Sequence, residues 1–232
     1  MTSARARMGT SRRPAVPSVV PPPHVGRALF PGFAASAVSL PAGSLHIPGW
    51  LDIDRQRDLV RQFREWALPP AGLRHPRVPS GHVMSVQSVC LGWHWQPYRY
   101  SRTADDTDGT PVKPLPASLA GLAAPWCRAD AAILNLYAPE ARLGLHQDAE
   151  EPASAPVVTI SLGDACVFRF AGVTRRTGPF TDLVLSSGDL LVFGGPSRRI
   201  YHGVPRILAD TGPDIGLPAG RLSITLRETG LS

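Results

Sequence analysis

Two pairs of polar residues with ligand chemistry stand close together in the middle of the chain. Asn135 and Tyr137 are two residues apart, and so are His146 and Asp148. Successive side chains of an extended strand point to opposite faces, so residues two apart point to the same face. Each pair would therefore direct both of its members into one cavity, an arrangement that suits a metal site.

A histidine and a carboxylate on one strand supply two ligands of the 2-His-1-carboxylate triad, which leaves positions of an octahedral Fe(II) open for a co-substrate and dioxygen. The third ligand has to come from elsewhere, and His202 in the segment Arg-Arg-Ile-Tyr-His-Gly is the best candidate. His-x-Asp alone is weak evidence, because a buried histidine hydrogen-bonded to a nearby carboxylate is a common structural arrangement. The three residues would also suit zinc, as in a zinc hydrolase.

A strictly alternating segment close to the end of the sequence adds a second kind of site. Residues 221–227 place Arg221, Ser223, Thr225 and Arg227 on one face of a predicted strand and three aliphatic residues on the other. Arginine offers a planar fork of donors that matches a carboxylate. We expect this face to bind a carboxylate, with a solvent-exposed strand face as the alternative. A zinc hydrolase would leave the two arginines without an evident role.

These motifs, in this order and spacing, resemble the AlkB family of Fe(II)/2-oxoglutarate dioxygenases, and among its branches the bacterial DNA repair enzymes in particular. The resemblance runs from about Leu29 onward and includes Met84-Ser-Val, Leu91-Gly-Trp93 and Ser161-Leu-Gly. It implies an iron held by His146, Asp148 and His202. It also implies a 2-oxoglutarate site in which Arg221 pairs with the distal carboxylate and Arg227 lies near the chelating one, with further contacts from Asn135, Tyr137 and Ser223.

The resemblance implies oxidative demethylation of N-alkylated bases, 1-methyladenine and 3-methylcytosine, in single-stranded or flipped-out DNA. Formaldehyde, succinate and CO2 would be released, and RNA is an alternative substrate. A base has to leave the duplex to reach such a site. The implied substrate residues are Trp93 stacking on the base opposite His146, Met84 lining the pocket, Tyr98 contacting backbone phosphate, and Glu150 beside the cationic base. As structural residues, the aromatics would instead belong to the core and Glu150 to the surface.

Other functions fit the same motifs. One is a related dioxygenase acting on RNA, a protein side chain or a small metabolite, because iron and 2-oxoglutarate residues do not name the substrate. Another is a non-catalytic jelly-roll module that binds metal but turns over no 2-oxoglutarate. The aromatic residues between positions 79 and 101 favour a nucleobase, since flat rings stack on bases.

The elements that must position these residues are mainly strands. Short apolar runs separated by Gly-Asp, Ser-Gly and Gly-Gly predict strands at residues 131–137, 157–162, 166–170, 182–185, 189–193 and 221–227. Asp52 or Asp54 would cap a helix over residues 55–66, and a short helix is expected near 117–124. Many strands with few helices indicate a sandwich or barrel. The resemblance makes this a double-stranded β-helix, or jelly-roll, with an N-terminal nucleotide-recognition lid.

Length, charge and cysteine content set the remaining expectations. The chain has 232 residues, and five of its six excess positive charges are arginines within the first 27 residues. We expect a disordered basic, proline-rich tail at 1–28 and one domain at 29–232, with the lid at about 79–101 and the jelly-roll at about 130–229. Three cysteines without a Cys-x-x-Cys motif favour a reducing cytoplasm. We expect a monomer that does not bind membranes.

Overall fold

The computed structural model describes residues 38–231, so the tail predicted for residues 1–28 lies outside the described residues. The helical elements are α1 (Ile53–Ala67), α2 (Ala117–Ala120) and the 3-10 turns η1 (Gly121–Ala123) and η2 (Gly195–Ser197). The strands are β1 (Ser44–Ile47), β2 (Gln87–Leu91), β3 (His94–Gln96), β4 (Arg99–Ser101), β5 (Ala131–Tyr137), β6 (Leu143–His146), β7 (Val157–Gly163), β8 (Ala165–Phe170), β9 (Thr181–Leu185), β10 (Leu190–Phe193), β11 (His202–Leu208) and β12 (Arg221–Arg227).

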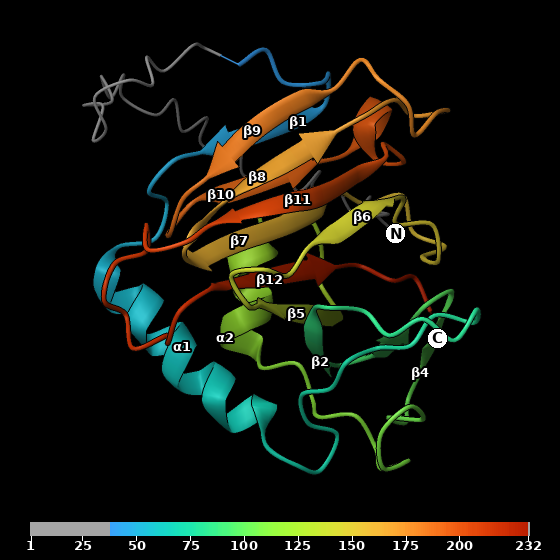
Figure 1. Cartoon of the computed structure of the whole chain (residues 1–232). Coiled ribbons are helices and arrows are strands. Elements are labelled where there is room, and N and C mark those ends of the chain that lie inside the picture. Colours follow the sequence, from blue (N-terminus) through green and yellow to red (C-terminus); the bar gives the residue numbers. More distant parts are fainter. Residues whose placement is uncertain (1–37, 232) are drawn as a thin grey trace, which may run out of the picture. The chain divides into compact units, whose positions relative to one another are not determined.

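Two antiparallel sheets form the body of the fold (Figure 1). One sheet has six strands in the order β1-β10-β7-β12-β5-β2, and the other has four in the order β6-β11-β8-β9. The strands β3 and β4 pair only with each other and form a separate hairpin. This arrangement confirms the predicted mainly β jelly-roll.

Helix α1 covers the outer face of the six-stranded sheet. Asp52 caps its first turn by accepting a hydrogen bond from the backbone N–H of Arg55 at 2.9 Å, which satisfies one of the free donors at a helix start. Leu59, Val60 and Phe63 are buried in one cluster with sheet residues, and the cluster also includes the apolar side chains of β12. The predicted helix is confirmed, and the observed helix begins two residues earlier than expected.

A second core fills the space between the two sheets. The rings of Phe168 and Phe170 of β8 pack against each other there, with their centroids 5.0 Å apart. The ring of Phe193 of β10 packs against both, with centroid distances of 6.4 and 6.0 Å. The strict alternation predicted for residues 221–227 therefore separates two environments. The aliphatic side chains of β12 join the helix-covered core, while its polar side chains point between the sheets.

Two strands near the predicted metal site differ from expectation. Strand β6 ends at His146, so Asp148 lies in the following loop rather than on one strand with His146. Strand β11 begins at His202 and continues through Gly203 and Pro205, with irregular register against both neighbours. Glycine and proline interrupt the apolar alternation that marks a strand in sequence, which explains why the length of β11 was not predicted.

Within residues 38–231, no helix combines the length and the apolar composition needed to cross a bilayer. The three cysteines Cys90, Cys127 and Cys166 are all buried free thiols.

Candidate metal and carboxylate site

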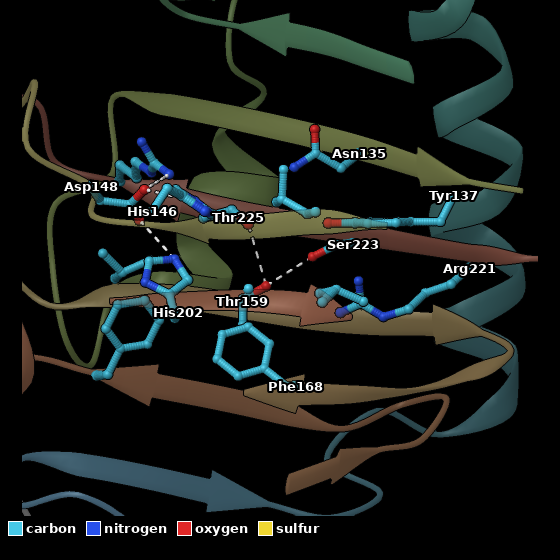
Figure 2. Close-up of a pocket in the computed structure, with 16 residues that line it drawn as sticks. Asn135, Tyr137, His146, Asp148, Thr159, Phe168, His202, Arg221, Ser223 and Thr225 are labelled. Carbon is cyan, nitrogen blue, oxygen red and sulfur yellow. Dashed lines mark hydrogen bonds and ion pairs between the residues drawn. The ribbon is translucent and has the colours of Figure 1, made fainter. Parts of the chain in front are cut away.

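His146, Asp148 and His202 come together at one end of the space between the sheets (Figure 2). His146 and His202 face each other across the β6–β11 pairing, and their ring centroids are 4.4 Å apart. The Asp148 carboxylate lies 3.6 Å from His146 Nε2 through Oδ1 and 3.7 Å from His202 Nε2 through Oδ2. One potential ligand atom from each residue lies within 4.8 Å of the others, so the three side chains could hold one metal ion.

Both histidines have their tautomer fixed by a backbone carbonyl. His146 Nδ1 lies 3.0 Å from the Gly144 oxygen, and His202 Nδ1 lies 3.0 Å from the Ile200 oxygen. A carbonyl oxygen can only accept, so Nδ1 must carry the proton in each ring. Nε2 is then left with its lone pair on the side facing Asp148, which is how metal-binding histidines are usually oriented.

The protonation states of two ligands also suit a metal. Burial, followed by the charge of His146, lowers the pKa of His202 to about 4, which keeps its imidazole neutral at neutral pH. Burial alone would raise the pKa of Asp148, but the charges of Arg227 and the two histidines outweigh it and hold that pKa below its usual value. A neutral imidazole and an ionised carboxylate are the forms that donate to a metal.

Arg221 lies at the opposite end of the same pocket, beside Tyr137 (Figure 2). Its side chain is almost fully buried, with 1% of the residue exposed, and its Nε donates to Ser161 Oγ at 2.9 Å. Nη1 and Nη2 have no hydrogen-bond partner among residues 38–231. Tyr137 and Cys166 lie beside the guanidinium, whose charge partly offsets the rise that burial causes in both of their pKa values. By distance and angle, neither residue is a hydrogen-bond partner of Nη1 or Nη2.

Hydroxyl groups connect the two ends of the pocket. Thr159 Oγ1 lies 3.0 Å from Ser223 Oγ and 3.3 Å from Thr225 Oγ1. Asn135 Oδ1 accepts a hydrogen bond from Ser88 Oγ at 2.6 Å, so its amide N–H groups remain available as donors. Thr159, Ser223, Thr225 and Asn135 all line the one pocket that runs between the two ends.

The residues present fit a dianionic ligand and a divalent metal. Buried charged groups are normally paired, yet the two terminal nitrogens of Arg221 and Oδ2 of Asp148 are buried without a hydrogen-bond partner in the described part of the chain. An anionic group at Arg221 and a cation at Asp148 would satisfy these atoms.

All predicted residues of the metal and 2-oxoglutarate sites line this one pocket. They are Asn135, Tyr137, His146, Asp148, His202, Arg221, Ser223 and Arg227. Arg227 lies at the metal end, where its Nη2 is 2.6 Å from Asp148 Oδ1.

The four predicted substrate residues lie outside the lining of this pocket. Trp93 is only 7% exposed, and the Arg102 guanidinium lies 3.4 Å from the centroid of its ring. Tyr98 is 71% exposed at the turn between β3 and β4. Met84 is half-buried, and Glu150 is half-buried and accepts from the backbone N–H of Ala149. Their roles stay predictions.

Sequence reasoning missed several pocket residues. Phe168 and Phe193 stack on or tilt against the His202 ring, with centroid distances of 5.6 and 4.8 Å. Thr159 shows no sequence signal beyond its position two residues before the predicted Ser161-Leu-Gly motif. Glu151 does not line the pocket, but its fully buried side chain contacts the pocket residue Arg227.

We expect Gly220→Ala to disturb the Arg221 end of the 2-oxoglutarate site. Gly220 has φ +107°, and an added Cβ would lie 2.1 Å from the Tyr137 carbonyl oxygen, directly before Arg221. Strain and clash should together cost more than about 1 kcal/mol of stability, measurable as a lower Tm, and should weaken 2-oxoglutarate binding. Gly49→Ala is the control, since Gly49 has φ +59° but open space around its Cβ position. Equal effects of both variants would show that backbone strain alone, and not the contact with Tyr137, is responsible.

Comparison with known proteins identifies the relationships of the chain. The family profile of the 2OG-Fe(II) oxygenase superfamily matches residues 43–227. An α-ketoglutarate-dependent dioxygenase AlkB homolog of Caulobacter vibrioides is 40% identical over 191 residues, covering 78% of this chain and 84% of that protein. The DNA N(6)-methyladenine demethylase ALKBH1D of Arabidopsis thaliana is 30% identical over 217 residues and 80% of this chain.

The match spans about half the length of the plant relatives, 49% for this one and 48% for a second Arabidopsis thaliana demethylase. Among solved structures, that of OsALKBH1 superposes with a TM-score of 0.75 at 29% identity, covering 82% of this chain and 98% of the other.

Proposed function

Because the chain belongs to the AlkB family within the 2OG-Fe(II) oxygenase superfamily, we propose that it demethylates N-methylated bases, 1-methyladenine and 3-methylcytosine, in single-stranded or flipped-out DNA. As a member of this family it is an Fe(II)- and 2-oxoglutarate-dependent dioxygenase. The identity of the substrate, the repair of alkylation damage and the roles of individual residues are parts of the proposal. One 2-oxoglutarate and one O2 would be consumed for each methyl group released as formaldehyde, with succinate and CO2 as co-products.

One observation carries the co-substrate assignment. The guanidinium of Arg221 is buried, and two of its nitrogens have no hydrogen-bond partner within residues 38–231. It shares one pocket with the cluster of His146, Asp148 and His202. A metal site alone would not need a buried cation at the other end. A ligand that bridges both ends must bear a carboxylate at Arg221 and chelating oxygens at the metal, as 2-oxoglutarate does.

We assign the roles of the side chains as follows. The Nε2 atoms of His146 and His202 and the Asp148 carboxylate would hold the iron, while Arg221 would hold the distal carboxylate through Nη1 and Nη2. Donors along the pocket orient the rest of the co-substrate: the Asn135 amide, the Tyr137 and Ser223 hydroxyls, and Arg227. Burial raises the pKa of Tyr137 to about 12, so its hydroxyl keeps its proton. When bound, iron and 2-oxoglutarate together supply the oxidant that hydroxylates the methyl group.

The substrate would enter from the side of the β3–β4 hairpin. Trp93 would stack on the base, Met84 would line its pocket, Tyr98 would contact phosphate, and Glu150 would face the positive charge of the base. The Arg102 guanidinium covers one face of the Trp93 ring. A base would therefore stack on the opposite face of the ring, or Arg102 would have to move away first.

Relatives of this chain favour a second candidate substrate, N6-methyladenine in DNA. Two of them are named as demethylases of this base, and a solved structure of the OsALKBH1 protein matches 82% of the chain. N6-methyladenine is uncharged, so the Glu150 carboxylate would stabilise its binding less than that of the cationic lesions. Unlike them, it can also still form a base pair.

The test is demethylation of oligonucleotides that carry one 1-methyladenine, 3-methylcytosine or N6-methyladenine, as single strands, duplexes and RNA. With Fe(II), 2-oxoglutarate and ascorbate, we expect loss of the methyl mass and matching formaldehyde from the cationic lesions in single strands. Reactions without 2-oxoglutarate and with unmethylated oligonucleotides are the controls. If succinate forms while every oligonucleotide keeps its methyl group, the substrate is a protein or a metabolite.

A further inference from the structure

A buried carboxylate beside the proposed iron site has no role in the assignments above. Only 1% of Glu151 is exposed, and both of its carboxylate oxygens are engaged. Oε1 accepts from Tyr100 OH at 2.5 Å and from Arg227 Nη1 at 2.6 Å, and Oε2 accepts from Arg198 Nη2 at 3.0 Å. Burial by itself would raise the pKa of Glu151, but the charge of Arg227 lowers it, so the carboxylate is ionised.

Both arginines that hold Glu151 also hold Asp148. Arg227 Nη2 lies 2.6 Å from Asp148 Oδ1, and Arg198 Nη1 donates to the Asp148 backbone oxygen at 2.8 Å. Arg198 is anchored further by Nε, which donates to the Ala155 oxygen at 2.8 Å. Glu151 therefore fixes two guanidiniums, one of which sets the side chain of Asp148 and the other its backbone.

The remaining partner of Glu151 belongs to the β3–β4 hairpin. Tyr100 lies on β4, opposite Trp95 of β3. Strand β3 begins directly after Trp93. Its hydroxyl donates to Glu151 Oε1 and accepts from Arg227 Nη1 at 3.0 Å. Burial raises the pKa of Tyr100 well above its usual value, so the donor proton is kept.

The other polar anchors of the hairpin lead away from the metal end. Trp95 O accepts from Arg74 Nη2 at 2.5 Å, and His94 Nε2 lies 2.5 Å from Asp106 Oδ1. Within residues 38–231, the Tyr100 hydroxyl is thus the hydrogen-bonding group of the hairpin that reaches the cluster around Asp148.

We propose that Glu151 is a positioning residue that couples the β3–β4 hairpin to the iron ligand Asp148, through Tyr100 on one side and Arg227 and Arg198 on the other. This inference rests on the proposed function, in which the hairpin carries the base-binding residues. The carboxylate keeps Asp148 aimed at the metal and holds the hairpin at a fixed distance from it. A base held by the hairpin is then presented to the site that Asp148 organises.

Tyr100→Phe and Glu151→Gln separate the two halves of this coupling. Tyr100→Phe removes one hydroxyl, so we expect backbone hydrogen exchange of residues 94–101 in the metal-free protein to accelerate about tenfold, with Mn(II) affinity within about twofold of wild type. Glu151→Gln removes the charge that fixes both arginines. We expect faster exchange in the hairpin and also Mn(II) affinity about 10- to 100-fold lower, the range for outer-shell partners of metal ligands.

Two neighbouring substitutions are matched controls for these two measurements. Tyr98→Phe removes a tyrosine hydroxyl from the same hairpin, but at an exposed position. Glu150→Gln neutralises the adjacent carboxylate, which accepts from the Ala149 backbone N–H and contacts no guanidinium within residues 38–231. Neither should change hairpin exchange or Mn(II) affinity. In the active enzyme, Tyr100→Phe should also yield less formaldehyde per succinate, because the substrate is presented less often. A purely structural role would not change that ratio.

Hydrogen exchange and Mn(II) binding are measured without nucleic acid, so both tests of the coupling remain valid even if the proposed substrate is wrong. Wild-type exchange in Tyr100→Phe would overturn the link to the hairpin, and wild-type Mn(II) affinity in Glu151→Gln would overturn the link to Asp148. If Glu151→Gln does not fold, Tyr100→Phe decides the proposal through hairpin exchange and the ratio of formaldehyde to succinate.

Discussion

Replacing Asp148 by asparagine should abolish turnover of 2-oxoglutarate and weaken Mn(II) binding by more than the roughly 10- to 100-fold lost with an outer-shell partner. The substitution keeps the shape of the side chain but removes the negative charge that would neutralise part of the cation. It also removes the only carboxylate among the three side chains that the structure brings together. Titration with Mn(II) and measurement of succinate formation check the two effects separately.

Asp148→Asn is also expected to destabilise the metal-free protein, because Arg227 loses the partner that lies 2.6 Å away. Breaking a buried ion pair typically costs about 3–5 kcal/mol, and the cost here should be lower since Arg227 keeps Glu151. His146→Ala separates the two consequences. The His146 side chain is 33% exposed, and within residues 38–231 its ring makes one hydrogen bond, to the Gly144 oxygen. Its loss should therefore remove metal binding with less effect on Tm. Wild-type Mn(II) affinity in both variants would refute the metal assignment.

The sequence predicted the polar face that lines one side of the pocket because this face lies on a strand with strong alternation. In β12, every second residue is polar and the others are aliphatic, so the pocket face follows from the period alone. Strand β5 was also predicted with its observed bounds, in this case from a short apolar run. The two ends of the pocket could then be related only by family resemblance, since no local pattern shows that β6, β11 and β12 enclose one space.

The role of Glu151 could not be predicted from sequence for a physical reason. Its partners Arg198, Tyr100 and Arg227 are 47, 51 and 76 residues away along the chain. Next to Glu150 and before Pro152, it has the local signature of a surface acid. Burial of a charged residue depends on partners that only the tertiary fold supplies.

The proposed base-binding segment shows the same limit. A hairpin with aromatic residues on both faces gives no indication of which ring faces the pocket. Trp93 is buried under Arg102, and Tyr98 is exposed at the turn. The position of Arg102 two residues after Tyr100 carries no signal of a cation stacked on an indole ring, because the contact depends on how the chain bends after β4.

Arg221→Met should change protein stability in opposite directions with and without 2-oxoglutarate. In the free protein, two nitrogens of the buried Arg221 guanidinium have no hydrogen-bond partner in the described part of the chain. Replacing a poorly compensated buried charge by an apolar side chain of similar length is often stabilising. We therefore expect the Tm of the Mn(II)-loaded variant without co-substrate to equal or exceed that of wild type.

With 2-oxoglutarate the order should reverse. A ligand at 100 times its Kd stabilises the folded state by about 2.7 kcal/mol, and wild type should show this gain as a higher Tm. Two charge-assisted hydrogen bonds are worth about 3 kcal/mol even at the low end, so their loss should raise the Kd of the variant more than about 100-fold and remove the gain. Differential scanning fluorimetry over a range of 2-oxoglutarate concentrations measures both quantities.

The control is Arg128→Met, because the Arg128 side chain is 94% exposed and pairs with Glu228 at the surface. Its Tm gain with 2-oxoglutarate should equal that of wild type. If Arg221 had only a structural role, its replacement would lower the Tm under both conditions. An arginine that binds an anion instead destabilises the protein when the site is empty and stabilises it when the anion is bound. A Tm gain in Arg221→Met as large as in wild type would place the co-substrate carboxylate elsewhere in the pocket.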